Sequence, residues 1–152
     1  MQFIQKYIYS LIFLVLFVLA VSISTAHAGQ AASEEAVAEK PTHYIVATYF
    51  HTTARCSTCH KIEELSSQAV NLNFENELKS GKVVWRAINV DEPENKHYNK
   101  DYQLYTKSLI ISEVKDGKEI QWKNLEKIWT YVRDEEKFDA YVKDEIKDWI
   151  EE

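Results

Sequence analysis

Hydrophobic residues fall into two kinds of pattern along this chain, and the first predicts a strand. Residues 44–50 are β-branched or aromatic and apolar at nearly every position, which is typical of a central strand buried on both faces. From Cys59 the period changes to three- and four-residue steps, which predicts an amphipathic helix. Its apolar positions are Ile62, Leu65, Ala69 and Val70, and Phe74 and Leu78 repeat the spacing after Asn71 and Asn73. We therefore expect the helix to bend or restart near residue 73 and to end at Gly81.

The second half of the chain continues this alternation. Asp116-Gly117 is a hairpin-turn dipeptide that predicts two antiparallel strands around it. Asn124 and Asp134 are expected to cap two final helices, the second with an apolar stripe of Phe138, Tyr141, Val142, Ile146 and Trp149. The remaining predicted elements are a strand at 83–90, a turn at 91–95, a short helix at 97–104, a strand from 108, and the return strand at 119–123.

Both cysteines, Cys56 and Cys59, lie between the first strand and the first helix. A Cys-x-x-Cys pair in that setting is typical of a redox dithiol, whereas Cys-x-x-Cys-His, completed here by His60, also spells a c-type haem attachment site. A structural disulfide is a poorer explanation of so close a pair, because closing a two-residue loop removes little chain entropy.

The element order predicts an α/β domain with a central mixed β-sheet flanked by helices and an extra C-terminal helix. Three stretches then resemble the thioredoxin-like superfamily: residues 44–65, Asn89-Val90-Asp91 and residues 102–117. Within it, the chain looks most like small exported ArsF-type proteins, catalogued with a nitrophenyl-compound nitroreductase subunit. The resemblance implies a thioredoxin-like fold over about residues 44–150 and a reversible Cys56–Cys59 disulfide as the redox centre, with no bound cofactor.

A helix N-terminus beside Cys56 favours its thiolate through the helix dipole and free backbone N–H groups. We therefore expect Cys56 to attack and Cys59, one turn further in, to act as the resolving thiol. Arg55 and His60 would add positive potential, unless both are only solvated surface residues.

Two departures from the thioredoxin pattern stand out. Thr48 is expected about where many thioredoxins have a buried acidic residue that assists the resolving cysteine. Residues 105–108 contain no proline, whereas the superfamily normally places a cis-proline facing the dithiol, at about Lys107 or Ser108 here. The resemblance therefore does not imply how an extended substrate would pair with this loop.

The N-terminus has the pattern of a secretory signal. Lys6 precedes an apolar run at residues 11–23, and Ala26-His27-Ala28 provides small residues at the positions a signal peptidase reads. We predict a signal peptide at 1–28, a flexible leader at 29–42 and a thioredoxin-like domain at 43–152. Left uncleaved, the longer stretch at residues 7–24 is just long enough to anchor the chain in a membrane. Either way, the domain is expected outside the cytoplasm, as a periplasmic or secreted protein.

The acidic balance of the chain bears on its partners. Lys6 is the one charged residue among residues 1–28, so the rest keeps 24 Asp and Glu against 17 Lys and Arg, without a basic cluster. Nucleic acid is therefore not an expected partner, because phosphate binding depends on concentrated positive charge. A protein thiol or disulfide partner, or another redox protein, is expected instead.

Three other functions remain open from the residues. A haem would use Cys56, Cys59 and His60, but Met1 is the sole methionine, which leaves His43, His51 and His97 as second axial ligands. Cys56 and Cys59 with His60 or His51 would suit a soft ion such as Cu(I) or Zn. A scaffold with a vestigial disulfide is the third. Core packing is the expected role of the four tryptophans, Trp85, Trp122, Trp129 and Trp149.

Overall fold

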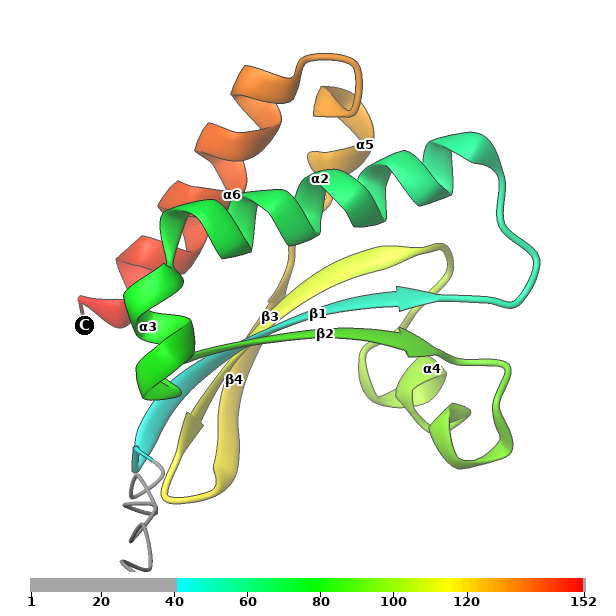
Figure 1. Ribbon diagram of the computed structural model, residues 1–152. Coiled ribbons are helices and arrows are strands. Elements are labelled where there is room, and N and C mark those ends of the chain that lie inside the picture. Colours follow the sequence, from blue (N-terminus) through cyan, green and yellow to red (C-terminus); the bar gives the residue numbers. More distant parts are fainter. Residues whose placement is uncertain (1–40, 152) are drawn as a thin grey trace, which may run out of the picture. The chain divides into compact units, whose positions relative to one another are not determined.

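The computed structural model describes residues 41–151, and the predicted signal peptide and nearly all of the predicted leader lie outside that range. Figure 1 shows a sheet with helices along it. The strands are β1 (His43–His51), β2 (Val83–Asn89), β3 (Ser108–Lys115) and β4 (Lys118–Asn124). The helices are α2 (Ser57–Asn73), α3 (Glu75–Ser80), the 3-10 turn η1 (Pro93–Asn95), α4 (Tyr98–Asp101), α5 (Ile128–Tyr131) and α6 (Glu135–Ile150).

The four strands form one mixed sheet in the order β2-β1-β3-β4. β1 pairs parallel with β2 and antiparallel with β3, and β3 pairs antiparallel with β4. A β-α-β crossover, a hairpin and a closing helix in this order are the thioredoxin-like arrangement. The predicted α/β thioredoxin-like fold with a central mixed sheet is therefore confirmed, and β1 is an inner strand, as its apolar run predicted.

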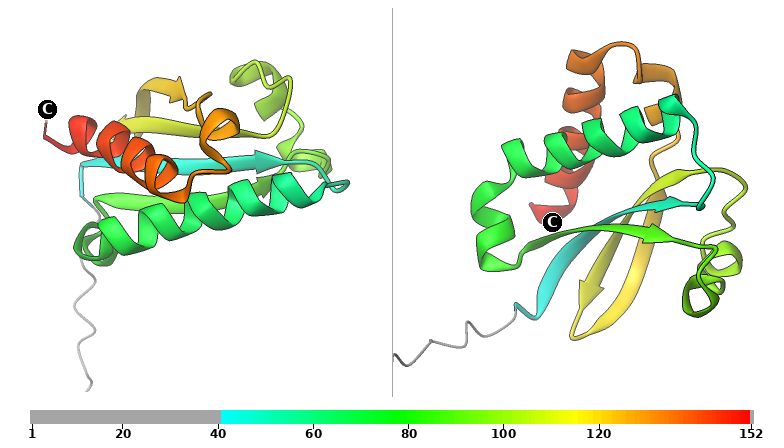
Figure 2. Two further views of the ribbon diagram at one scale, coloured as in Figure 1. Left: turned by 90° about the horizontal axis from the view of Figure 1, so that it is seen from above. Right: turned by 45° about the vertical axis from the view of Figure 1, so that its right-hand side comes forward.

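The main core lies between one face of the sheet and the helices α2 and α6, which lie along that face (Figure 2). Alternate residues of β1, namely Ile45, Ala47 and Tyr49, point into it because successive strand residues face opposite sides. The predicted stripe of α6 is confirmed, since Phe138, Val142 and Ile146 are fully buried there. A smaller cluster on the other face joins Phe50, Val90 and Ile110 to side chains from the α4 region.

Several helix boundaries follow the predicted signals. The first helix does stop and restart: α2 ends at Asn73, and Phe74, with φ −130° and ψ 35°, separates it from α3. Gly81 ends α3 in the left-handed conformation, with φ 77°. Asp134 caps α6 by accepting a hydrogen bond from the Lys137 backbone N–H. These positions depend on local backbone chemistry, which is why the sequence pattern located them.

The predicted cap at Asn124 is wrong. Asn124 is the last residue of β4 and pairs with Ile110, so its backbone belongs to the sheet. The ladder continues at Leu125, whose N–H donates to the Leu109 carbonyl at 2.8 Å. The first of the two predicted final helices is consequently the single turn α5, which begins only at Ile128.

Candidate functional site: a dithiol at the start of α2

The cysteine loop leaves the end of β1 and is held against the end of β2. The Thr53 backbone N–H donates to Asp91 Oδ2 at 2.8 Å, and Asn89 Nδ2 donates to Thr53 Oγ1 at 3.0 Å. Asn89 and Asp91 belong to the segment that the sequence likened to the thioredoxin strand end and acidic turn. Their contacts fix the loop that leads into Cys56, and hence the place where α2 begins.

Cys56 is the N-cap of α2, in extended conformation with φ −86° and ψ 168°. Its Sγ accepts a hydrogen bond from the Cys59 backbone N–H at 3.3 Å. The two Sγ atoms lie 2.7 Å apart, and both cysteines are free thiols. Cys56 is exposed, whereas Cys59 is buried with 4% of its surface accessible. This asymmetry fits an attacking Cys56 and a resolving Cys59.

The pKa of the Cys56 thiol is lowered from its ordinary value. The largest cause is the hydrogen bond from the Cys59 side chain, followed by the one from the Cys59 backbone N–H. Both donors stabilise the thiolate, which is the nucleophilic form. The Cys59 thiol, a donor that the sequence alone did not indicate in this role, is therefore the largest contributor, and the predicted backbone N–H groups come second.

Arg55 and His60 add less positive potential at Cys56 than their positions next to the cysteines in the sequence predict. The Arg55 guanidinium forms an ion pair with the Glu63 carboxylate, one turn beyond Cys59 on α2. A guanidinium with a carboxylate partner adds little net positive potential at a neighbouring sulfur. His60 is exposed on the first turn of α2. The thiolate thus depends on α2 itself more than on these two side chains.

The residue beneath the dithiol is Tyr49. Its side chain is fully buried, and its hydroxyl donates to the Cys59 carbonyl oxygen at 2.8 Å. Burial, together with the nearby Cys59 charge, raises the pKa of Tyr49 far above its ordinary value, so the phenol stays protonated and remains a donor. Tyr49 therefore ties the first turn of α2 to β1.

The prediction that Thr48 lies at this position is wrong. Thr48 pairs with Ile110 on β3, and Ile110 belongs to the cluster on the sheet face away from α2. Tyr49 pairs with Leu109, which belongs to the main core below α2. A shift of one residue along a strand moves a side chain to the other face, which explains the error.

The loop where the superfamily normally has its proline lies at the start of β3. Ser108 is buried, and its hydroxyl donates to the Thr106 carbonyl at 3.0 Å. The Lys107 carbonyl accepts a hydrogen bond from Trp129 Nε1 at 3.0 Å, which joins this loop to α5. Tyr105, just before it, is 94% exposed. This loop has no proline ring to fix its backbone, and hydrogen bonds to the carbonyls of Thr106 and Lys107 hold it instead.

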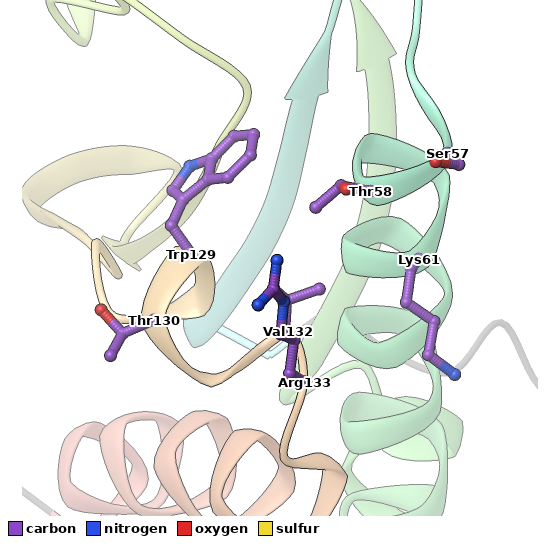
Figure 3. A pocket seen from close by; sticks show the side chains of 7 residues that line it. All are labelled: Ser57, Thr58, Lys61, Trp129, Thr130, Val132 and Arg133. Carbon is purple, nitrogen blue, oxygen red and sulfur yellow. The ribbon is translucent and has the colours of Figure 1, made fainter.

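A groove opens beside the dithiol, and its lining includes Ser57, the residue that follows Cys56. It has a volume of about 520 Å³, and Figure 3 shows Trp129 and Arg133 on one side facing Thr58 of α2 on the other. Sequence reasoning missed both residues. It interpreted all four tryptophans as packing residues, yet Trp129 is 36% and Trp122 37% exposed, while Trp85 and Trp149 do pack against the core.

The histidines considered as metal or haem ligands are scattered. His43 starts β1, at the opposite end of the strand from His51, and contacts the buried Glu113. His97 precedes α4, where its Nδ1 lies 2.8 Å from the Glu94 carbonyl oxygen. Among residues 41–151, no three His, Cys, Asp or Glu side chains are grouped so that they could hold a metal ion. In the same range, no helix is both long and apolar enough to cross a membrane.

Strand order, strand direction and the site together define a thioredoxin-like domain with a paired dithiol at the start of its first long helix. No protein-family model matches the chain, and no curated protein matches it. Among solved structures, the chain is similar to thioredoxin from Fasciola hepatica, with 19% identity and a TM-score of 0.35. That match covers 53% of this chain and 66% of the thioredoxin, just under two thirds. The fold assignment therefore depends on the topology of the domain itself.

Proposed function

We propose that this protein is an exported thiol-disulfide oxidoreductase that exchanges a disulfide between its Cys56–Cys59 pair and a partner protein. The observation that carries the proposal is the pair itself: an exposed Cys56 with a lowered pKa, 2.7 Å from the sulfur of a buried Cys59. A disulfide bond is about 2.05 Å long, so a small movement closes this one.

The exchange proceeds in two steps. The Cys56 thiolate attacks one sulfur of a substrate disulfide, forming a mixed disulfide and releasing the other substrate sulfur as a thiolate that takes up a proton. Cys59 then loses its proton and attacks Cys56 Sγ, which forms the Cys56–Cys59 disulfide and releases the second substrate thiol. Two electrons pass from the protein to the substrate, and the reverse sequence oxidises a substrate dithiol. A lowered Cys56 pKa favours the reduced protein and hence a more oxidising couple.

A thiol-trapping titration tests the redox function. The purified domain is equilibrated with mixtures of reduced and oxidised glutathione, and its free thiols are labelled with a reagent that shifts its mobility on a gel. We expect one reversible two-electron transition that Cys56→Ser abolishes, while Cys59→Ser accumulates a mixed disulfide at Cys56. A midpoint above about −200 mV indicates a dithiol oxidase, and one below about −250 mV a reductase. A pair that shows no transition rules out the proposal.

Export is the second part of the proposal, and it is supported by the sequence pattern at residues 1–28. Expression of the full chain in a bacterium, followed by fractionation and intact-mass measurement, should give a periplasmic protein that begins at Gly29. Ala28→Leu should block cleavage and leave the chain at the membrane. A full-length protein in the cytoplasmic fraction would argue against export. The resemblance to ArsF-type proteins is part of this proposal and assigns no substrate.

One absorption spectrum distinguishes a haem protein from a dithiol oxidoreductase. Covalent attachment requires the two cysteine sulfurs to bond to two different vinyl groups of one haem, whereas here the sulfurs lie 2.7 Å apart and Cys59 is buried. Protein expressed with haem-attachment machinery should show no absorption bands of a covalent haem in alkaline pyridine. Such bands would replace the dithiol function with electron transfer by haem.

A further inference from the structure

The groove beside the dithiol contains a cation without a partner. Arg133 follows α5, and its guanidinium points into the space between Trp129 and Thr58 (Figure 3). Arg133 is exposed, and within residues 41–151 it forms no hydrogen bond and no ion pair. A guanidinium presents up to five N–H donors, and that of Arg133 can bind an anion in the groove without first breaking an ion pair.

The other charged side chains around the groove are already paired. Lys61 Nζ lies 2.7 Å from the Glu135 carboxylate, and Figure 3 shows the Lys61 side chain directed away from Arg133. Asp134, next to Arg133 in the chain, pairs with Lys137 at 2.7 Å and caps α6. Arg133 therefore provides the uncompensated positive charge of the groove wall.

The groove that contains the Arg133 charge lies next to Cys56, the residue whose sulfur reacts. Ser57 and Thr58, which line the groove, directly follow Cys56 at the start of α2. On the other wall, Trp129 is held by its hydrogen bond to the Lys107 carbonyl, so the indole is fixed rather than free to fill the groove. A chain bound by a disulfide to Cys56 would place its flanking residues in the groove, beside Trp129 and Arg133.

We propose that this groove is a carboxylate subsite, which selects substrates with an acidic residue beside the cysteine that exchanges with Cys56. The inference rests on the proposed function and names its substrate class. Arginine suits this role because its planar guanidinium binds a carboxylate through two parallel hydrogen bonds. The apolar part of the flanking residue would pack on the Trp129 indole. The same chemistry is offered by an acidic protein segment and by a small acidic thiol such as glutathione.

Matched disulfide substrates test the subsite on the reduced full domain. Three capped pentapeptides differ only in Glu, Gln or Lys beside a central cysteine, and each is used as its homodisulfide, with glutathione disulfide as the small acidic substrate. We expect kcat/KM for the Glu peptide to exceed that for the Gln peptide about threefold at low salt, the size of an exposed ion pair. The Lys peptide should be slowest, and the preference should shrink as salt rises to about 300 mM.

Variants then assign the preference to Arg133. Arg133→Gln should bring the ratio of Glu to Gln peptide rates to about one, and Arg133→Lys should keep part of it. Arg86→Gln is the matched control: it removes the same charge from an exposed position on β2, paired with Thr48 on the opposite sheet face, and should leave the ratio unchanged. The ratio compares two substrates on one protein, so a modest loss of stability does not affect it.

The outcomes separate this inference from the proposed function. Peptides that react through Cys56 at equal rates whatever the flanking residue would overturn the subsite and leave the oxidoreductase standing. Peptides that do not react at all would overturn both. If Arg133→Gln slows only the Glu peptide, the subsite serves protein substrates; if it also slows glutathione disulfide equally, the site accepts small acidic thiols.

Discussion

Replacing Tyr49 by phenylalanine isolates one hydrogen bond beneath the dithiol. Phenylalanine fills the same buried space, so the change leaves no cavity and removes only the bond from the hydroxyl to the Cys59 carbonyl. A neutral intramolecular hydrogen bond contributes about 1 kcal/mol net. The Cys59 carbonyl lies within α2, whose own ladder provides it with another partner, so no buried acceptor is left wholly unpaired. We therefore expect Tyr49→Phe to lower the unfolding free energy by about 1 kcal/mol, or Tm by about 4 °C.

The same geometry limits the redox effect of Tyr49→Phe. The hydroxyl contacts a backbone carbonyl and neither sulfur, so the reduced and oxidised forms should lose similar stability. Because 30 mV corresponds to about 1.4 kcal/mol for a two-electron couple, the midpoint should move by less than about 15 mV. Urea unfolding and thiol trapping measure the two quantities, with Tyr105→Phe as the exposed control. Unchanged stability, or a midpoint shift above about 30 mV, would refute a purely positioning role.

Three further substitutions test other parts of the domain. Cys59→Ala removes the largest cause of the lowered Cys56 pKa, so the pH at which Cys56 becomes reactive toward iodoacetamide should rise; an unmoved profile would contradict this cause. Glu113→Gln should destabilise the domain by about 2 kcal/mol at neutral pH, because Lys115 and other partners hold the pKa of this buried carboxyl below its ordinary value. That contribution is present above the unfolded pKa and lost as pH falls through the folded one, so urea midpoints of the two proteins should converge in acid. Gly117→Ala should lower the unfolding free energy measured in urea by about 1 kcal/mol, because φ at this position is 76°. The added methyl group meets no atom within 4 Å, so the cost comes from the backbone alone. Equal stability would show that the turn can relax.

The fold was predictable because its signals are local. The apolar run of β1, the helical spacing after Cys59 and the Asp116-Gly117 turn each determine backbone geometry within a few residues. Their order then leaves few ways to arrange a mixed sheet. Asn124 shows the limit of this reasoning, because its side chain suits a helix cap while sheet pairing with β3 uses its backbone.

The dithiol could be predicted from its motif, but its surroundings could not. Which of Thr48 and Tyr49 lies under Cys59 depends on the length of the loop between β1 and α2, and one residue reverses the answer. Arg133 and Trp129 are more than 70 residues from Cys56, and only the packing of the α5 segment near the start of α2 brings them to the groove. No periodicity in the sequence marks such a meeting.

The hydrogen bonds to Cys56 also couple the redox state of the pair to the stability of the whole domain. The Cys59 donors stabilise a Cys56 thiolate, and a disulfide has no charge for them to stabilise. Oxidation and unfolding form a closed thermodynamic cycle, so the difference in unfolding free energy between the two forms equals the difference in reduction potential between the folded and unfolded dithiol. If the reduced form resists urea better, the folded dithiol is a stronger oxidant than the unfolded one by the same free energy. Two unfolding curves therefore show, before any partner is known, whether folding makes the dithiol a stronger or a weaker oxidant.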